Sequence, residues 1–131
     1  MTVREQIESA GVQVNASTVE ELVRRIVAVA DPERIVLFGS AARGTMRPGS
    51  DLDVLVIKPG QFDYHKLISS IYVALADFEQ SVDVVLVTPE QVQRYKDSFC
   101  LVLYPALREG KVVYERAALS SETIEAADAH R

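Results

Sequence analysis

The sequence has little cysteine, no tryptophan and no long hydrophobic run. Cys100 is the one cysteine among 131 residues, so no disulfide can form within the chain, and we expect a reducing compartment, the cytoplasm. No apolar stretch approaches the roughly 18–20 residues that a membrane-spanning helix needs. The segment 1–10 is too polar for a signal peptide. We therefore predict a cytoplasmic protein without a membrane partner.

Basic charge is scarce as well. There are 14 Lys and Arg against 19 Asp and Glu, which gives a net charge of −5. A protein that binds nucleic acid through its phosphates needs a basic surface, so nucleic acid is not an expected partner. The Gly-Lys-Ser/Thr ending of a P-loop is absent, and neither His65 nor His130 belongs to a recognisable nucleophile–base set.

Hydrophobic periodicity and turn signals predict a single α/β domain. The predicted helices span residues 2–10, 17–30, 64–78 and 89–109, and the predicted strands span residues 34–38, 51–57, 82–87 and 111–115. Ser17 and Glu20 form a capping-box pattern at the start of the second helix, and Thr88 and Gln91 form another around Pro89. The third helix has an apolar side made of Leu67, Ile68, Ile71, Tyr72, Leu75 and Phe78.

Two aspartates open the second predicted strand. Asp51 and Asp53 are two residues apart, so on a strand they lie on the same face. Asp-x-Asp at a strand start is also a common turn feature. However, Asp53 lies between Leu52 and Val54, where a carboxylate without a partner is costly. A divalent ion would offset the repulsion of the pair, and oxygen ligands favour Mg²⁺ or Mn²⁺.

Asp83 repeats this pattern inside the third predicted strand, Val82–Val87. On its own, Asp83 is equally well interpreted as an exposed residue of an edge strand. If the second and third strands are neighbours, three carboxylates meet at one edge of the sheet. Phosphoryl and nucleotidyl transfer use such a cluster to hold two metal ions about 3.5–4 Å apart. We therefore predict that Asp51, Asp53 and Asp83 are metal ligands and catalytic residues.

The loop between the first two strands offers groups for phosphate binding. Gly39 lets the backbone approach a ligand, and Ser40 adds a hydroxyl donor beside it. Arg43 is placed to reach a triphosphate, and Ser50 adds a second hydroxyl. Each also has a plainer interpretation: Gly39-Ser40 as a simple turn, Arg43 as a solvated side chain, and Ser50 as the cap of the turn.

Together these residues resemble a known signature. Gly39-Ser40, ten residues and Asp51-x-Asp53 resemble the motif of the DNA polymerase β-like nucleotidyltransferase superfamily, and Val82-Asp83-Val84 resembles its later single-carboxylate strand. The segments 39–44 and 107–115 resemble the minimal nucleotidyltransferases, which are often encoded beside a small helical HEPN toxin as its antitoxin. The resemblance implies a mixed sheet of about four strands with flanking helices. It places the nucleotidyltransferase domain at 17–115, between an N-terminal extension (1–16) and a polar C-terminal tail (116–131).

The resemblance also implies a reaction. A nucleoside monophosphate is transferred from a nucleoside triphosphate with Mg²⁺, two ions being expected. In the antitoxin branch AMP passes from ATP to a tyrosine of the HEPN toxin. Larger relatives carry a second domain for the acceptor, for which this chain has no room. Three hypotheses follow: a protein adenylyltransferase, a small-molecule transferase acting for example on an aminoglycoside, and a silent antitoxin that works by binding. The carboxylates favour the first two, and the missing acceptor domain favours the first over the second.

Overall fold

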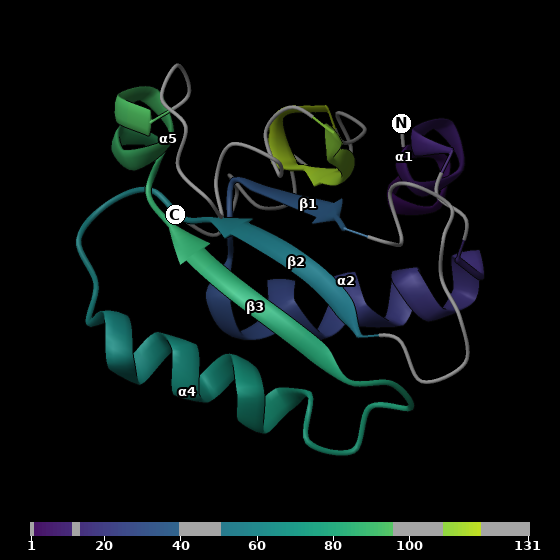
Figure 1. Cartoon of the computed structure of the whole chain (residues 1–131), viewed down its shortest axis with the longest axis horizontal. Helices are drawn as coiled ribbons and strands as arrows, with labels where there is room; N and C mark the ends of the chain where they lie inside the picture. The colour runs from purple at the N-terminus through teal and green to yellow at the C-terminus, as the bar shows by residue number, and fades with distance from the viewer. Residues whose placement is uncertain (1, 12–13, 40–50, 96–108, 119–131) are drawn as a thin grey trace, which may run out of the picture.

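A single four-stranded sheet organises the chain (Figure 1). The computed structural model describes residues 2–11, 14–39, 51–95 and 109–118. The strands are β1 (Arg34–Phe38), β2 (Leu52–Ile57), β3 (Val82–Val87) and β4 (Lys111–Glu115), in the order β3-β2-β1-β4. β1 pairs antiparallel with both β2 and β4, and β2 pairs parallel with β3. The predicted mixed sheet of four strands is therefore confirmed.

The helices begin and end close to the predicted positions. They are α1 (Val3–Ala10), α2 (Ala16–Ala30), α4 (Tyr64–Ala74) and α5 (Pro89–Tyr95), and a short 3-10 helix, η1 (Arg116–Ala118), follows β4. The capping box of α5 is confirmed, because the Gln91 N–H donates to Thr88 Oγ1 at 3.2 Å and the Thr88 N–H donates to Gln91 Oε1 at 2.9 Å. The predicted continuation of this helix over 96–108 lies outside the described residues.

Four predicted boundaries are wrong, two of them for a visible reason. α1 begins at Val3, because Thr2 is its N-cap and accepts a hydrogen bond at Oγ1 from the Glu5 N–H at 3.1 Å. α2 is capped by Asn15, whose Oδ1 accepts a hydrogen bond from the Ser17 N–H at 2.8 Å; asparagine caps as well as serine, and it comes first in the chain. α4 ends at Ala74 rather than at Phe78, where the chain continues in tighter turns, and Arg25 of α2 donates a hydrogen bond to the free Ala74 carbonyl at the end of the helix. β2 begins at Leu52, one residue later than predicted.

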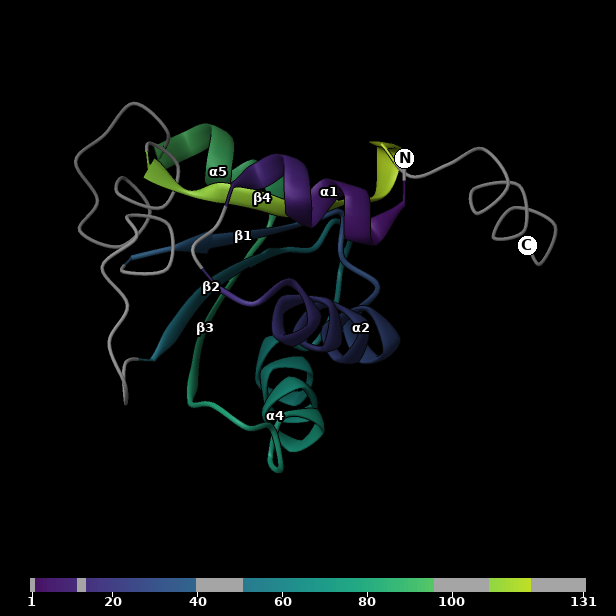
Figure 2. The same cartoon turned by 90° about the vertical axis from the view of Figure 1, so that its right-hand side faces the viewer.

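Helices α2 and α4 cover one face of the sheet (Figure 2). Their buried residues pack against alternate residues of the strands, and each fully buried Val, Leu or Ile contributes about 1.5–3 kcal/mol. This core includes Val19, Leu22, Val23, Ile26 and Ile71 of the helices and Ile35, Leu37, Leu52, Val54, Val56, Leu86 and Val113 of the sheet.

The opposite face of the sheet carries a smaller apolar cluster. It comprises Val36, Leu55, Ile57 and Val87, with Phe38, Val85 and Val92 of α5 packed against them. β2 contributes to both clusters, so it is buried on both faces and is the central strand that its apolar sequence predicts.

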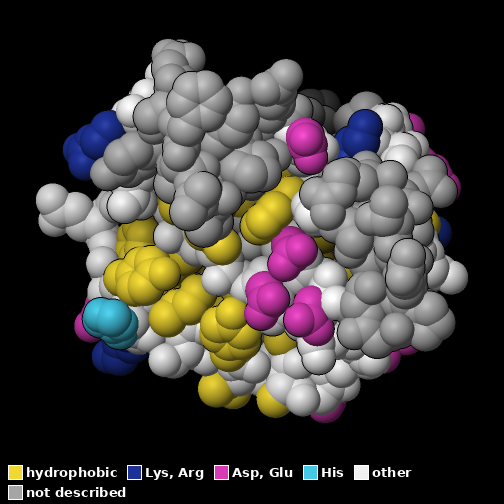
Figure 3. Space-filling model, in the orientation of Figure 1, with side chains coloured by type: hydrophobic (Ala, Val, Ile, Leu, Met, Phe, Trp, Pro, Cys, Tyr) yellow, Lys and Arg dark blue, Asp and Glu magenta, His cyan; other side chains and the backbone are white. Residues whose placement is uncertain are grey.

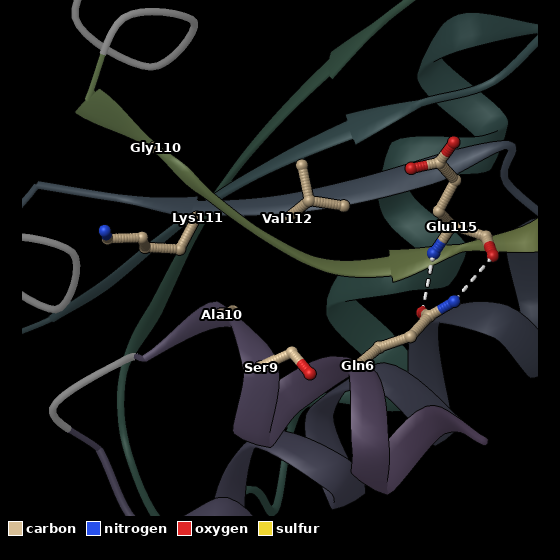
Figure 4. Close-up of a pocket in the computed structure, with 7 residues that line it drawn as sticks. All are labelled: Gln6, Ser9, Ala10, Gly110, Lys111, Val112 and Glu115. Atoms are coloured by element: carbon tan, nitrogen blue, oxygen red, sulfur yellow. Dashed lines mark hydrogen bonds between the residues drawn. The ribbon is translucent and has the colours of Figure 1, made fainter. Parts of the chain in front are cut away.

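Helix α1 is attached to the free edge of β4 by one side chain. The buried Gln6 donates from Nε2 to the Glu115 carbonyl and accepts at Oε1 from the Glu115 N–H, both at 2.9 Å (Figure 4). A glutamine amide thereby replaces the neighbouring strand at one residue of an edge strand. Ile7, the next residue, enters the main core.

No helix among the described residues combines the length and the apolar character needed to cross a membrane.

Candidate functional site

β2 and β3 carry two aspartates side by side. Asp53 is the register partner of Asp83 in the parallel pair, so both side chains leave the sheet on the same face from strands about 4.8 Å apart. Asp53 has the same parity as Leu55 and Ile57, which places it on the face opposite α2 and α4. Asp53 is half-buried and Asp83 is exposed. The two strands are therefore neighbours, which is the condition that the sequence sets for bringing these carboxylates together.

Acidic side chains gather on this face of the molecule. Figure 3 shows them in a group beside hydrophobic side chains, in the same view as Figure 1. Asp51, directly before β2, is exposed and adds a third carboxylate to the same segment as Asp53. The group combines negative charge with accessibility, which suits a site for cations.

Gly39 brings the backbone at the end of β1 against the Asp53 carboxylate. Phe38 pairs with Asp53 across the antiparallel strands, and Gly39 follows with a φ of +68°. A Cβ at Gly39 would lie 3.2 Å from Asp53 Cγ and would overlap its Oδ2. Glycine is required here for both its backbone conformation and its lack of a side chain.

The structure does not gather all the predicted site residues. Among the described residues, no group of three or more His, Cys, Asp and Glu lies close enough to hold a metal ion. Asp51 precedes the first pair of the ladder, Leu52 with Val82, so the register does not fix it beside Asp83. The assignment of all three aspartates as metal ligands stays a prediction. Ser40, Arg43 and Ser50 lie outside the described residues.

The chemistry of Asp53 and Asp83 nevertheless fits a divalent cation. Carboxylate oxygens are the ligands that Mg²⁺ prefers, and Mg²⁺ is usually held by one or two carboxylates together with substrate phosphates and water. Two carboxylates on adjacent strands satisfy that requirement without a third protein ligand.

One neighbour of the site is Tyr72 of α4. It lies on the side of the helix that the sequence predicts, but 44% of it is exposed, and its hydroxyl accepts a hydrogen bond from the Val84 N–H at 2.9 Å. The signal in the sequence was the hydroxyl itself, because a tyrosine that packs at a strand edge needs a polar partner.

A pocket of about 310 Å³ lies elsewhere, between α1 and β4 (Figure 4). It is lined by Gln6, Ser9, Ala10, Gly110, Lys111, Val112 and Glu115. β4 forms the edge of the sheet opposite β3, so this pocket is separate from the aspartates.

Comparison with known proteins assigns the fold to a family. A family model described as nucleotidyltransferase domain matches residues 16–118. A mutant of the toxin–antitoxin MntA-HpeT is similar at 22% identity with a TM-score of 0.51, covering 86% of this chain and 79% of that chain.

Two further solved structures are similar at lower TM-scores. They are a toxin–antitoxin with AMP-PNP (23% identity, TM-score 0.47, 86% of this chain and 80% of that chain) and a candidate nucleotidyltransferase from Sulfolobus solfataricus (18% identity, TM-score 0.44, 80% and 93%). No curated protein matches the chain. The family match runs from the first residue of α2 to the last residue of η1 and includes Gly39, Asp53 and Asp83, so the chain belongs to the nucleotidyltransferase domain family.

Proposed function

We propose that this nucleotidyltransferase transfers AMP from ATP, with Mg²⁺, to a hydroxyl group of a protein partner. The proposal rests on one observation above all: Asp53 and Asp83 are register partners on the face of the sheet opposite α2 and α4, beside the glycine turn that ends β1. The partner that we propose is a small helical HEPN-type toxin, and the acceptor is a tyrosine of that toxin. The transfer neutralises the toxin, so the chain acts as an antitoxin.

In this proposal the three aspartates have two roles, metal binding and proton transfer. Asp51, Asp53 and Asp83 are the metal ligands, and when two Mg²⁺ ions are bound they neutralise the charge of the triphosphate and of the transition state. Asp83 lies on an edge strand and is exposed, so it is the carboxylate that an acceptor hydroxyl can approach. We assign to Asp83 the additional role of taking the proton of that hydroxyl.

The chemical step balances with these groups. The hydroxyl oxygen of the acceptor forms a bond to the α-phosphorus of ATP, and its proton passes to a carboxylate. The bond between the α-phosphorus and the oxygen that bridges to the β-phosphorus breaks, and pyrophosphate leaves with the electron pair. Gly39, Ser40, Arg43 and Ser50 are proposed to bind the triphosphate.

Two further observations support a protein as the acceptor. A solved structure with the same fold is the toxin–antitoxin MntA-HpeT. The net charge of −5, with acidic side chains gathered on the face of the proposed site, favours a partner with a basic surface (Figure 3).

Co-expression with the product of the neighbouring gene tests the proposal. We expect the toxicity of that product to be relieved by the wild type and not by the Asp53→Asn/Asp83→Asn variant. The intact mass of the product should increase by one or more AMP groups only with the wild type, ATP and Mg²⁺. A neighbouring protein that keeps its mass in the presence of active wild type would contradict the proposed acceptor.

The same experiment separates this proposal from the alternative function, an antitoxin that works by binding alone. Equal relief of toxicity by the wild type and by the double variant, without a change in mass, would identify that function.

A further inference from the structure

We propose that Tyr72 is a positioning residue for Asp83. The hydroxyl of Tyr72 fixes the peptide group that follows Asp83 and thereby sets the direction in which this carboxylate leaves the sheet. The inference rests on the proposed function, because its consequence is a loss of transfer.

The first half of β3, which carries Asp83, is only partly buried. β3 is an edge strand, and its first four residues, Val82 to Val85, are half-buried or exposed, whereas the last two are buried. In β2, by contrast, Asp53 is the one residue that is not buried. Since Asp83 itself is exposed and its neighbours are only partly buried, backbone hydrogen bonds contribute to how well Asp83 is placed.

The hydrogen bond from Tyr72 acts directly on Asp83. The Val84 N–H that donates to the Tyr72 hydroxyl at 2.9 Å belongs to the peptide group joining Asp83 to Val84. That group is planar and bonded to the Cα of Asp83, so fixing its orientation fixes the backbone of Asp83 on one side. On its other side, β3 is held by the ladder to β2 and by the hydrogen bond from the Leu52 N–H to the Ser81 carbonyl at 2.9 Å. The start of β3 is thus held along both of its edges.

The position of Tyr72 is well fixed because α4 is anchored to the main core and to α2. Ile71, the residue before it, is fully buried in the main core. Two residues after it, the Ala74 carbonyl accepts a hydrogen bond from Arg25 Nη1 at 3.1 Å, and the same nitrogen contacts Asp77 Oδ1 at 2.6 Å. Helix α2 therefore holds this turn of α4, and Tyr72 transmits that position to the strand of the proposed site.

Removal of one oxygen atom tests the inference. In Tyr72→Phe the ring stays and the hydroxyl is lost. The matched control is Tyr64→Phe, because Tyr64 lies on the same helix, is 45% exposed, and contacts His65 through an edge-to-face ring pair. With a protein acceptor, ATP and Mg²⁺, we expect kcat of Tyr72→Phe to fall about tenfold, as misplacement of a reacting group predicts. KM for ATP should change by less than about twofold and the melting temperature by less than about 4 °C.

A second measurement tests the hydrogen bond itself. Amide hydrogen exchange at Val84 should become faster in Tyr72→Phe and stay unchanged in Tyr64→Phe. Faster exchange at Val84 with an unchanged kcat would overturn the inference, because Tyr72 would then protect the strand edge only. Unchanged exchange would overturn it as well.

A wild type that transfers no AMP would contradict the proposed function and, with it, the role of Tyr72. An active wild type with equally active Tyr72→Phe would contradict the role of Tyr72 alone.

Discussion

The Asp53 carboxylate occupies the space that a side chain at position 39 would need. Gly39→Ala combines the strain of a φ of +68° with displacement of the Asp53 carboxylate. Gly11 is a matched control, since its φ is +69° and nothing lies within 4 Å of a Cβ placed on it. We expect both variants to lose about 1–3 kcal/mol of unfolding free energy from backbone strain.

Transfer of AMP should distinguish the two glycine variants. Gly39→Ala should lower the rate by about a hundredfold, because its methyl group moves a carboxylate of the proposed site. Gly11→Ala should keep the wild-type rate. Equal rates for the two variants would show that the contact between Gly39 and Asp53 has no role in the reaction.

Asp53 and Asp83 are like charges on neighbouring strands. Replacing either with asparagine removes a proposed metal ligand and should abolish transfer of AMP. The unfolding free energy should stay equal or rise, because direct cross-strand repulsion between like charges is relieved. Transfer assays and thermal unfolding of Asp53→Asn and Asp83→Asn check this prediction. Near wild-type turnover in Asp53→Asn would contradict the prediction.

Residues whose chemistry conflicts with their surroundings are the clearest signal in this sequence. Asp53 and Asp83 each interrupt an apolar strand, and the register places them side by side. For Tyr72 the sequence indicates the side of the helix and not the burial, because an aromatic residue at helical spacing has the same pattern whether its ring is buried or lies along a strand edge. The cap at Asn15 was missed for a similar reason, since Asn15 and Ser17 are both good caps and only the local geometry decides between them.

Among the elements, α1 depends on Gln6 for its attachment to β4. Gln6→Ala removes two hydrogen bonds and leaves the N–H and carbonyl of Glu115 to find other partners, so we expect a loss of about 2 kcal/mol of unfolding free energy. Ser9→Ala, an exposed change on the same helix, should cost less than about 0.5 kcal/mol. Urea unfolding of the two variants measures the difference. Indistinguishable midpoints would show that Gln6 does not hold α1.

Helix α2 and the turn that follows α4 are joined by a contact that responds to pH. The hydrogen bond and charge of Arg25 hold the pKa of Asp77 below its ordinary value of 3.8. The unfolded state therefore takes up a proton first as the pH falls, so the stabilisation is complete above about pH 4 and is lost as the pH falls through the lowered pKa.

Asp77→Asn tests this contact. The difference in unfolding free energy between the wild type and Asp77→Asn should be present at about pH 6 and should shrink below about pH 3. A difference that stays constant across this range would show that the charge of Asp77 contributes nothing. The asparagine retains the size of the side chain, so the comparison isolates the charge.

The existence and order of the elements followed from the sequence because their apolar patterns are strong. The ends of elements did not follow where the apolar pattern continues past the helix. α4 ends at Ala74 and the chain goes on in tighter turns, yet Phe78 still packs against the core, so the apolar pattern runs on to Phe78 although the helix does not.

For the molecule as a whole, the acidic balance predicts how the partner associates. The net charge of −5 and the acidic group on the face of the proposed site should attract a basic surface over long range. We expect the dissociation constant of the complex to rise about tenfold or more between roughly 50 and 500 mM salt, mainly through slower association. Kinetic binding measurements at both salt concentrations check this, and an affinity independent of salt would point to an apolar interface instead.

The pairing of β1 with β4 has a consequence for how the chain folds. Arg34 is the register partner of Glu115, so this half of the sheet joins segments far apart in the sequence, whereas β1 and β2 are close enough to pair locally. During synthesis the β1–β2 pair can form early, but the sheet cannot close until residue 115 has left the ribosome. The hydrogen bond from Gln6 of α1 also needs Glu115, so it cannot form earlier. The helix that is synthesised first is therefore among the last to be fixed, and closure over this long loop is the step expected to limit the folding rate.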